Sequence, residues 1–118
     1  MAINDDYKRL TADALERIEE VSAEEAGLRR AAGAVLLDIR DPDEVAQTPS
    51  VPGSIAISRG RLESRIADAV PDKHTPVMVY CAGGGRGRLA TDTLRQLGYE
   101  NAANIAGGLR GWRDTFGD

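Results

Sequence analysis

The sequence predicts an α/β protein with a mostly parallel central sheet and helices on both faces. Two apolar runs, Val77–Tyr80 and Ala34–Ile39, are typical of strands buried on both faces, which show continuous rather than alternating hydrophobicity. Helical patterns alternate with strand patterns along the chain, as they do in parallel sheets. The chain has 118 residues, of which 42% are hydrophobic and 29% charged, and this composition fits one globular domain with one core.

The N-terminal part of the chain predicts two helices. Apolar residues recur every three or four positions over Asp5–Glu20, and charged residues fill the other face, so we expect an amphipathic helix packed on the domain. Ser22 and Glu25 form a capping box, which predicts that a second helix covers Ala23–Ala32. Gly33 suits the C-terminal cap of that helix.

Two charged residues follow the first buried strand. Asp38 and Arg40 stand at the carboxyl end of the strand Ala34–Ile39, where ligands bind in open α/β sheets. Pro42 then occupies the first position of a short helix, which ends before Pro49.

The remaining elements complete the alternation of strands and helices. Trp112, in the last of them, is expected to anchor the core. In chain order these elements are a strand over Ser54–Ser58, a helix from Leu62 to Pro71, the strand Val77–Tyr80, a helix from near Arg88 to Gly98, a strand over Ala103–Ala106 and a last short helix.

The stretch after the strand Val77–Tyr80 carries the chemistry. Cys81, the only cysteine, is followed by Ala82, three glycines and Arg86. In a strand, tight loop and helix arrangement, backbone N–H groups and the helix N-terminus converge on one point, where they stabilise a thiolate and an anion bound to it. A lone cysteine at a strand end is commonly a small buried hydrophobe. A cysteine that only packs in the core does not require three flexible glycines after it, however, so the glycines favour a reactive site.

Several segments resemble the rhodanese-like sulfurtransferases. Tyr80–Arg86 (YCAGGGR) is similar to the active-site loop of that family. The segments LLDIRDPDEV, VPGSI and LATDTLRQLGYENAANIAGGLRGW are similar to further family motifs, in the family's order, and together they span Val21 to Trp112. The resemblance implies the three-layer rhodanese-like fold in a single domain, residues 21–118, with residues 1–20 as an N-terminal helical extension.

The resemblance also implies an activity. A thiolate at Cys81 would take the outer sulfur of a small-molecule donor such as thiosulfate, hold it as a persulfide, and pass it to a thiol or cyanide-type acceptor. A protein could also accept the sulfur. Arg86 would hold the loop or meet an anionic donor. The residues expected to bind substrate around Cys81 are Ala82, Gly83, Gly84, Gly85, Arg86, Asp38 and Arg40.

Two positions depart from the family pattern. Gly87 stands where a hydroxyl residue usually follows the loop arginine, so a hydroxyl that could hydrogen-bond the loop is missing. Ser50 stands where the family has a histidine.

Other readings remain open from the sequence. A rhodanese-like module could carry sulfur or bind a partner without turnover. A related cysteine-dependent phosphatase or arsenate reductase would need five residues between cysteine and arginine, and only four separate Cys81 from Arg86. A cysteine protease is disfavoured because His74 precedes the strand that Cys81 follows, which separates the two by roughly 15–20 Å.

The composition also predicts which partners the protein lacks and where in the cell it is located. A net charge of −4 disfavours nucleic acid. The N-terminus has no apolar stretch, so we expect no signal sequence, no membrane partner and a cytoplasmic location, which would keep a thiol reduced. One cysteine and one histidine cannot form a zinc site, and we expect no metal or cofactor.

Overall fold

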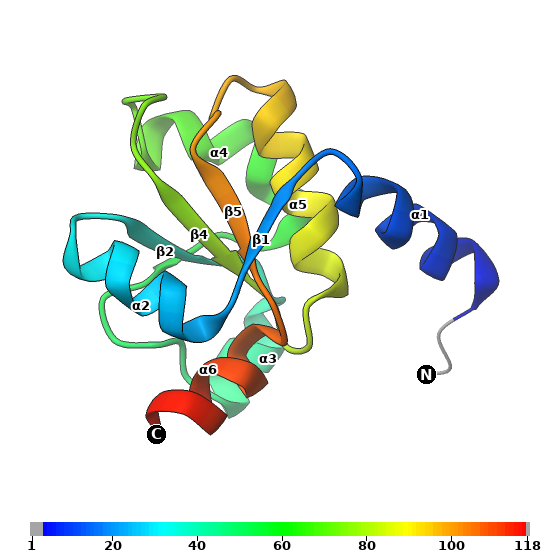
Figure 1. Cartoon of the computed structure of the whole chain (residues 1–118). Coiled ribbons are helices and arrows are strands. Elements are labelled where there is room, and N and C mark those ends of the chain that lie inside the picture. Colours follow the sequence, from blue (N-terminus) through cyan, green and yellow to red (C-terminus); the bar gives the residue numbers. More distant parts are fainter. Residues whose placement is uncertain (1–3, 118) are drawn as a thin grey trace.

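The computed structural model describes residues 4–117 and confirms the predicted α/β fold (Figure 1). Within these residues the sheet has five strands, all parallel, in the order β1-β5-β4-β2-β3. The strands are β1 (Glu19–Val21), β2 (Val35–Asp38), β3 (Ile55–Ala56), β4 (Val77–Tyr80) and β5 (Ala102–Ile105).

Helices cover both faces of the sheet and give the molecule three layers (Figure 1). One face packs against α4 (Leu62–Ala69) and α5 (Gly85–Gln96), and the other packs against α2 (Ala23–Ala31) and α6 (Gly108–Phe116). The remaining helical elements are α1 (Asp5–Leu15), which packs beside α5, α3 (Pro42–Gln47), which follows β2, and the short 3₁₀ turn η1 (Arg59–Arg61), which precedes α4.

The central strand β4 divides the interior into two cores. Val77 and Val79 pack with the core of α4 and α5, whereas Met78 and Tyr80 pack with that of α2 and α6. Each of the four is at most 1% exposed, which is why the strand is apolar throughout. Trp112 is buried in the second core, which confirms its predicted role as an anchor.

The N-terminal helix is shorter than predicted. It ends at Leu15, and the last residues of the predicted span, Glu19 and Glu20, belong to the edge strand β1, which pairs with β5. Three strand residues are too few to show a period of two, and Ile18 and Val21 continued the helical spacing. Residues 1–3 and 118 lie outside the described residues. The division into 1–20 and 21–118 stays a prediction, and β1 crosses its boundary.

Helix α5 begins earlier than predicted. Its first residue is Gly85 rather than a residue near Arg88, so Gly85, Arg86 and Gly87 form its first turn. The start of the helix could not be predicted because Gly85 and Gly87 are weak helix formers. Half of the capping box predicted for α2 is present: Ser22 Oγ accepts a hydrogen bond from the Glu25 N–H at 3.1 Å, while the Glu25 carboxylate accepts one from Arg29 Nε at 2.8 Å. Among the described residues, no helix has the length and apolar character that crossing a membrane requires.

Candidate active site

Cys81 lies at the carboxyl end of β4, in the middle of the sheet, with its side chain 1% exposed. The chain then turns through Ala82 and Gly83 into the N-terminus of α5. The Gly84 N–H donates to Cys81 Sγ at 3.0 Å. Gly84 has φ +118°, a left-handed conformation that glycine adopts without strain, and this geometry points its N–H back at the sulfur. The loop therefore holds the sulfur at a helix N-terminus, where negative charge is stabilised.

The start of α6 fixes the other side of the loop. The N–H groups of Leu109 and Arg110 donate to the carbonyl oxygens of Cys81 and Ala82, at 2.7 and 3.2 Å. Gly108 has φ +58°, and a Cβ atom there would overlap the Cys81 carbonyl oxygen. Glycine is required at this position because the loop that follows β4 lies directly against it.

Arg86 binds a carboxylate of α3. Its guanidinium donates to both Glu44 oxygens, at 2.5 and 2.8 Å. The hydrogen bond from Arg86 lowers the pKa of Glu44 to about 2 and raises that of Arg86, so the pair stays charged well into the acid range. Of the two roles expected for Arg86, the geometry favours holding the loop, because Glu44 already neutralises its charge.

Asp38 and Arg40 form a buried ion pair, with side chains 0% and 3% exposed and Arg40 Nη2 2.8 Å from Asp38 Oδ2. Arg40 also donates to the Thr48 carbonyl at 2.8 Å, and Ser50 Oγ donates to Asp38 at 2.6 Å. Burial would raise the pKa of Asp38, but the bonds from Arg40 and Ser50 outweigh it and lower this pKa. The pair therefore holds the segment after α3, and substrate contact by either residue stays a prediction.

Asn104 on β5 fills the space that a side chain at position 87 would need. A Cβ atom on Gly87 would overlap Asn104 Oδ1 and lie 3.2 Å from its Cγ. Asn104 Nδ2 donates to the Gly84 carbonyl at 3.3 Å and to Glu20 at 2.9 Å, and Glu20 binds Arg88 at 2.8 Å. The amide of Asn104 thus ties the loop to β1 in a place where the family carries a hydroxyl.

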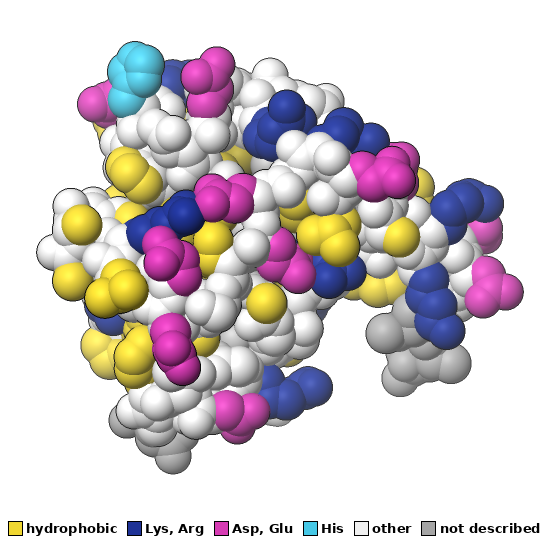
Figure 2. Space-filling model, in the orientation of Figure 1, with side chains coloured by type: hydrophobic (Ala, Val, Ile, Leu, Met, Phe, Trp, Pro, Cys, Tyr) yellow, Lys and Arg dark blue, Asp and Glu magenta, His cyan; other side chains and the backbone are white. Residues whose placement is uncertain are grey.

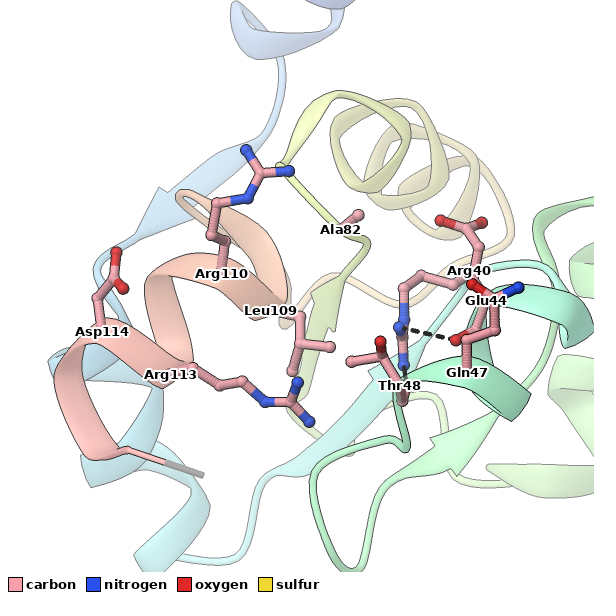
Figure 3. Close-up of a pocket in the computed structure, with 9 residues that line it drawn as sticks. All are labelled: Arg40, Glu44, Gln47, Thr48, Ala82, Leu109, Arg110, Arg113 and Asp114. Atoms are coloured by element: carbon pink, nitrogen blue, oxygen red, sulfur yellow. Dashed lines mark hydrogen bonds between the residues drawn. The ribbon is translucent and has the colours of Figure 1, made fainter.

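A cavity of about 340 Å³ opens beside the loop (Figure 3). Figure 3 shows Arg110 extending from the first turn of α6 to the loop. Its Nη1 atom lies 3.9 Å from the position that a Cβ atom of Gly83 would take. The cavity is lined by Arg40, Glu44, Gln47, Thr48, Ala82, Leu109, Arg110, Arg113 and Asp114.

Arg110 differs from the other arginines near the loop because its guanidinium is not paired with a carboxylate in the described residues. Arg40, Arg86 and Arg88 are each paired with a carboxylate. Within residues 4–117 the guanidinium of Arg110 has no such partner and no hydrogen bond. On the face shown in Figure 2, Lys and Arg side chains likewise lie next to Asp and Glu side chains. The cavity beside the loop therefore has an unpaired positive charge in its wall.

The sequence pattern gives no indication that Arg110, Glu44 or Asn104 belongs to the site. Glu44 and Asn104 reach the loop from α3 and β5, and no local pattern connects them with it. For Arg110 the only signal was its place directly after the Gly107–Gly108–Leu109 turn, which resembled a packing motif.

The site has one cysteine in a loop of backbone amides, at the carboxyl edge of a parallel sheet between two helical layers, and this arrangement defines a class of α/β domains. Residues 22–115 match the model of the rhodanese-like domain. The chain belongs to that family.

Similar proteins agree with this assignment. The chain is 40% identical over 74 residues to the thiosulfate sulfurtransferase PspE of Escherichia coli K12, which covers 63% of this chain and 69% of PspE. The polysulfide-sulfur transferase homodimer of Wolinella succinogenes superposes with a TM-score of 0.76 at 32% identity, over 93% of this chain and 83% of that one. A Rhodopseudomonas palustris protein of unknown function, described as a possible tyrosine phosphatase, superposes with a TM-score of 0.80 at 32% identity, over 100% and 96%. At the level of the family, PspE and the Wolinella succinogenes protein support sulfurtransferase activity.

Proposed function

We propose that the protein is a sulfurtransferase that moves a sulfane sulfur from a donor such as thiosulfate to a thiophilic acceptor through a persulfide on Cys81. The observation that carries this proposal is the Gly84 N–H bond to Cys81 Sγ, 3.0 Å long, at the N-terminus of α5. This arrangement stabilises a thiolate before the reaction and an anionic outer sulfur after it. A reducing cytoplasm, the location we propose, would keep the thiol free.

The reaction has two steps. The Cys81 thiolate attacks the outer sulfur of thiosulfate, a new S–S bond forms, and the S–S bond of the donor breaks so that its electron pair leaves with sulfite. Cyanide or a thiolate then attacks the outer sulfur of the persulfide, and the electron pair of that bond returns to Cys81 as the thiolate. Each step is a displacement at sulfur, so the cycle needs no external oxidant or reductant.

Treatment with thiosulfate tests the proposal directly. We expect the intact mass of the purified protein to increase by one sulfur atom, and cyanide to restore the original mass with release of thiocyanate. Repeated release with excess donor would distinguish an enzyme from a module that carries sulfur without turnover. An unchanged mass would contradict the proposal.

Arg110 is expected to bind the anionic end of the donor, because its charge is unpaired and it lines the cavity beside Ala82. Arg110→Ala should raise the KM for thiosulfate by about tenfold, with a smaller change in kcat, as for the loss of one charge-assisted hydrogen bond at an exposed site. Steady-state kinetics at low salt measure the effect. Arg65→Ala removes the same charge from the exposed face of α4 and should leave KM unchanged. Equal KM values for the two variants would remove Arg110 from the site.

A phosphatase is the second candidate, because the Rhodopseudomonas palustris structure is described as a possible tyrosine phosphatase. The geometry of the loop disfavours it. Gly84 N already lies 3.0 Å from Sγ, and only four residues separate Cys81 from Arg86, one fewer than a loop around a tetrahedral oxyanion would need. Assay of aryl phosphate hydrolysis alongside sulfur transfer separates the two activities.

A further inference from the structure

The N-terminal helix α1 reaches the active-site loop. It packs along α5, with Thr11 and Ala14 buried, and Arg17, just beyond its end, binds Asp92 of α5 at 2.7 Å. The family match begins at residue 22, so α1 lies outside the matched domain. Tyr7, in the first turn of this helix, extends its phenol to Gly85, the first residue of α5.

Tyr7 is the residue of α1 that touches the loop region. A Cβ atom on Gly85 would overlap the Tyr7 hydroxyl and lie 3.0 Å from its Cζ. Gly85, unlike Gly84, is not among the glycines with positive φ, so its backbone could carry any residue. The lack of a side chain at position 85 is explained by the phenol that lies on it.

The Tyr7 hydroxyl is available as a hydrogen-bond donor. Within residues 4–117 no group accepts a hydrogen bond from it. Burial and the negative charge of Cys81 raise the pKa of Tyr7, against the smaller opposing effects of Arg86 and Arg88. The raised pKa favours the protonated phenol, which can donate a hydrogen bond, and the contact with Gly85 places its hydroxyl at the first residue of α5.

We propose that Tyr7 is a substrate-binding residue, whose hydroxyl donates a hydrogen bond to the anionic group of the sulfur donor as it approaches Cys81 past Gly85. The proposal rests on the proposed function and makes α1 a part of the active site. Tyr7 lies on Gly85, whereas Arg110 Nη1 lies 3.9 Å from the place that a Cβ atom of Gly83 would take, so the two side chains approach the loop at different glycines.

The variant Tyr7→Phe removes the hydroxyl and keeps the ring on Gly85. We expect the KM for thiosulfate to rise about five- to tenfold, the effect of one net hydrogen bond, with kcat little changed. Leu10→Ala, at a position 50% exposed on the same helix, is the control and should keep the wild-type KM.

Alkylation of Cys81 gives a readout that does not depend on sulfur transfer. Iodoacetate carries a carboxylate and iodoacetamide does not, so the ratio of their rates reports anion recognition at the thiol. Tyr7→Phe should lower this ratio about fivefold while the iodoacetamide rate stays constant. A wild-type ratio in Tyr7→Phe overturns the proposal, whatever the KM. If the wild type transfers no sulfur, the proposed function fails, and the ratio still decides the role of Tyr7.

Discussion

Replacing Cys81 by serine is expected to lower sulfur transfer from thiosulfate to cyanide by about a thousandfold or more, to the background rate. The serine hydroxyl would occupy the same place below the Gly84 N–H, but it would remain protonated. His74, the one histidine of the chain, is exposed beyond the opposite end of β4 and cannot serve as its base. The persulfide mass after thiosulfate treatment should disappear with the activity.

The fold should tolerate this change. Serine is close to cysteine in size, and the Gly84 N–H can donate to its oxygen as it does to sulfur. Circular dichroism and the unfolding midpoint, measured on the same samples, check that the loss is chemical. Aryl phosphate hydrolysis by the wild type should not exceed that of Cys81→Ser. Sulfur transfer by Cys81→Ser at the wild-type rate would eliminate the mechanism, and strong Cys81-dependent hydrolysis would favour the phosphatase.

Asp38→Ala is expected to reduce the free energy of unfolding by about 3–5 kcal/mol, since it leaves the Arg40 charge buried without its partner. That is a large share of the roughly 5–15 kcal/mol that stabilises a typical domain. Arg40 is 3% exposed and cannot turn into solvent without disturbing the segment at Thr48. Urea unfolding at neutral pH, followed by circular dichroism, measures the difference.

Two comparisons sharpen the measurement. Glu63→Ala removes the carboxylate of an exposed pair with Arg59 and should change stability by less than about 1 kcal/mol. The pKa of Asp38 is lowered by folding, so its contribution is complete above the pKa of the unfolded carboxylate and is lost as the pH falls through the folded pKa. The wild type and Asp38→Ala should therefore converge in acid. A loss for Asp38→Ala no larger than that for Glu63→Ala would contradict the buried-pair argument.

Some elements could be predicted to the residue and others could not. Strand β4 was predicted at Val77–Tyr80, its observed bounds, because burial on both faces makes it apolar throughout. Strand β1 was missed because its three residues include two glutamates. The edge strand tolerates these glutamates because Glu19 forms an ion pair with Arg29 and Glu20 forms one with Arg88. Both arginines lie outside the strand, so its own sequence does not reveal these pairs.

Some residues of the site could likewise be predicted from the sequence and others could not. Cys81 and the glycine loop are contiguous, so their chemistry could be proposed from their order alone. The partners that orient or complete the loop arrive from α1, α3, β5 and α6. Glu44 lies 42 residues before Arg86, and only the assembled sheet brings the two together. Tyr7 falls in the apolar stripe of the predicted N-terminal helix, where a phenol cannot be distinguished from a packing residue.

The steric overlap between a Cβ atom at position 87 and the side chain of Asn104 makes substitutions at these two positions depend on each other. A Cβ atom at position 87, which the hydroxyl residue typical of the family would bring, overlaps Asn104 Oδ1, so any side chain there requires the Asn104 amide to move. A residue smaller than asparagine at position 104 would leave room for a Cβ atom at position 87, but it would lose the hydrogen bond from Asn104 to the Gly84 carbonyl. The effects of substitutions at positions 87 and 104 are therefore expected to be non-additive. A library that varies position 87 alone samples only variants with a displaced Asn104, whereas joint variation of both positions gives access to loops with either polar support.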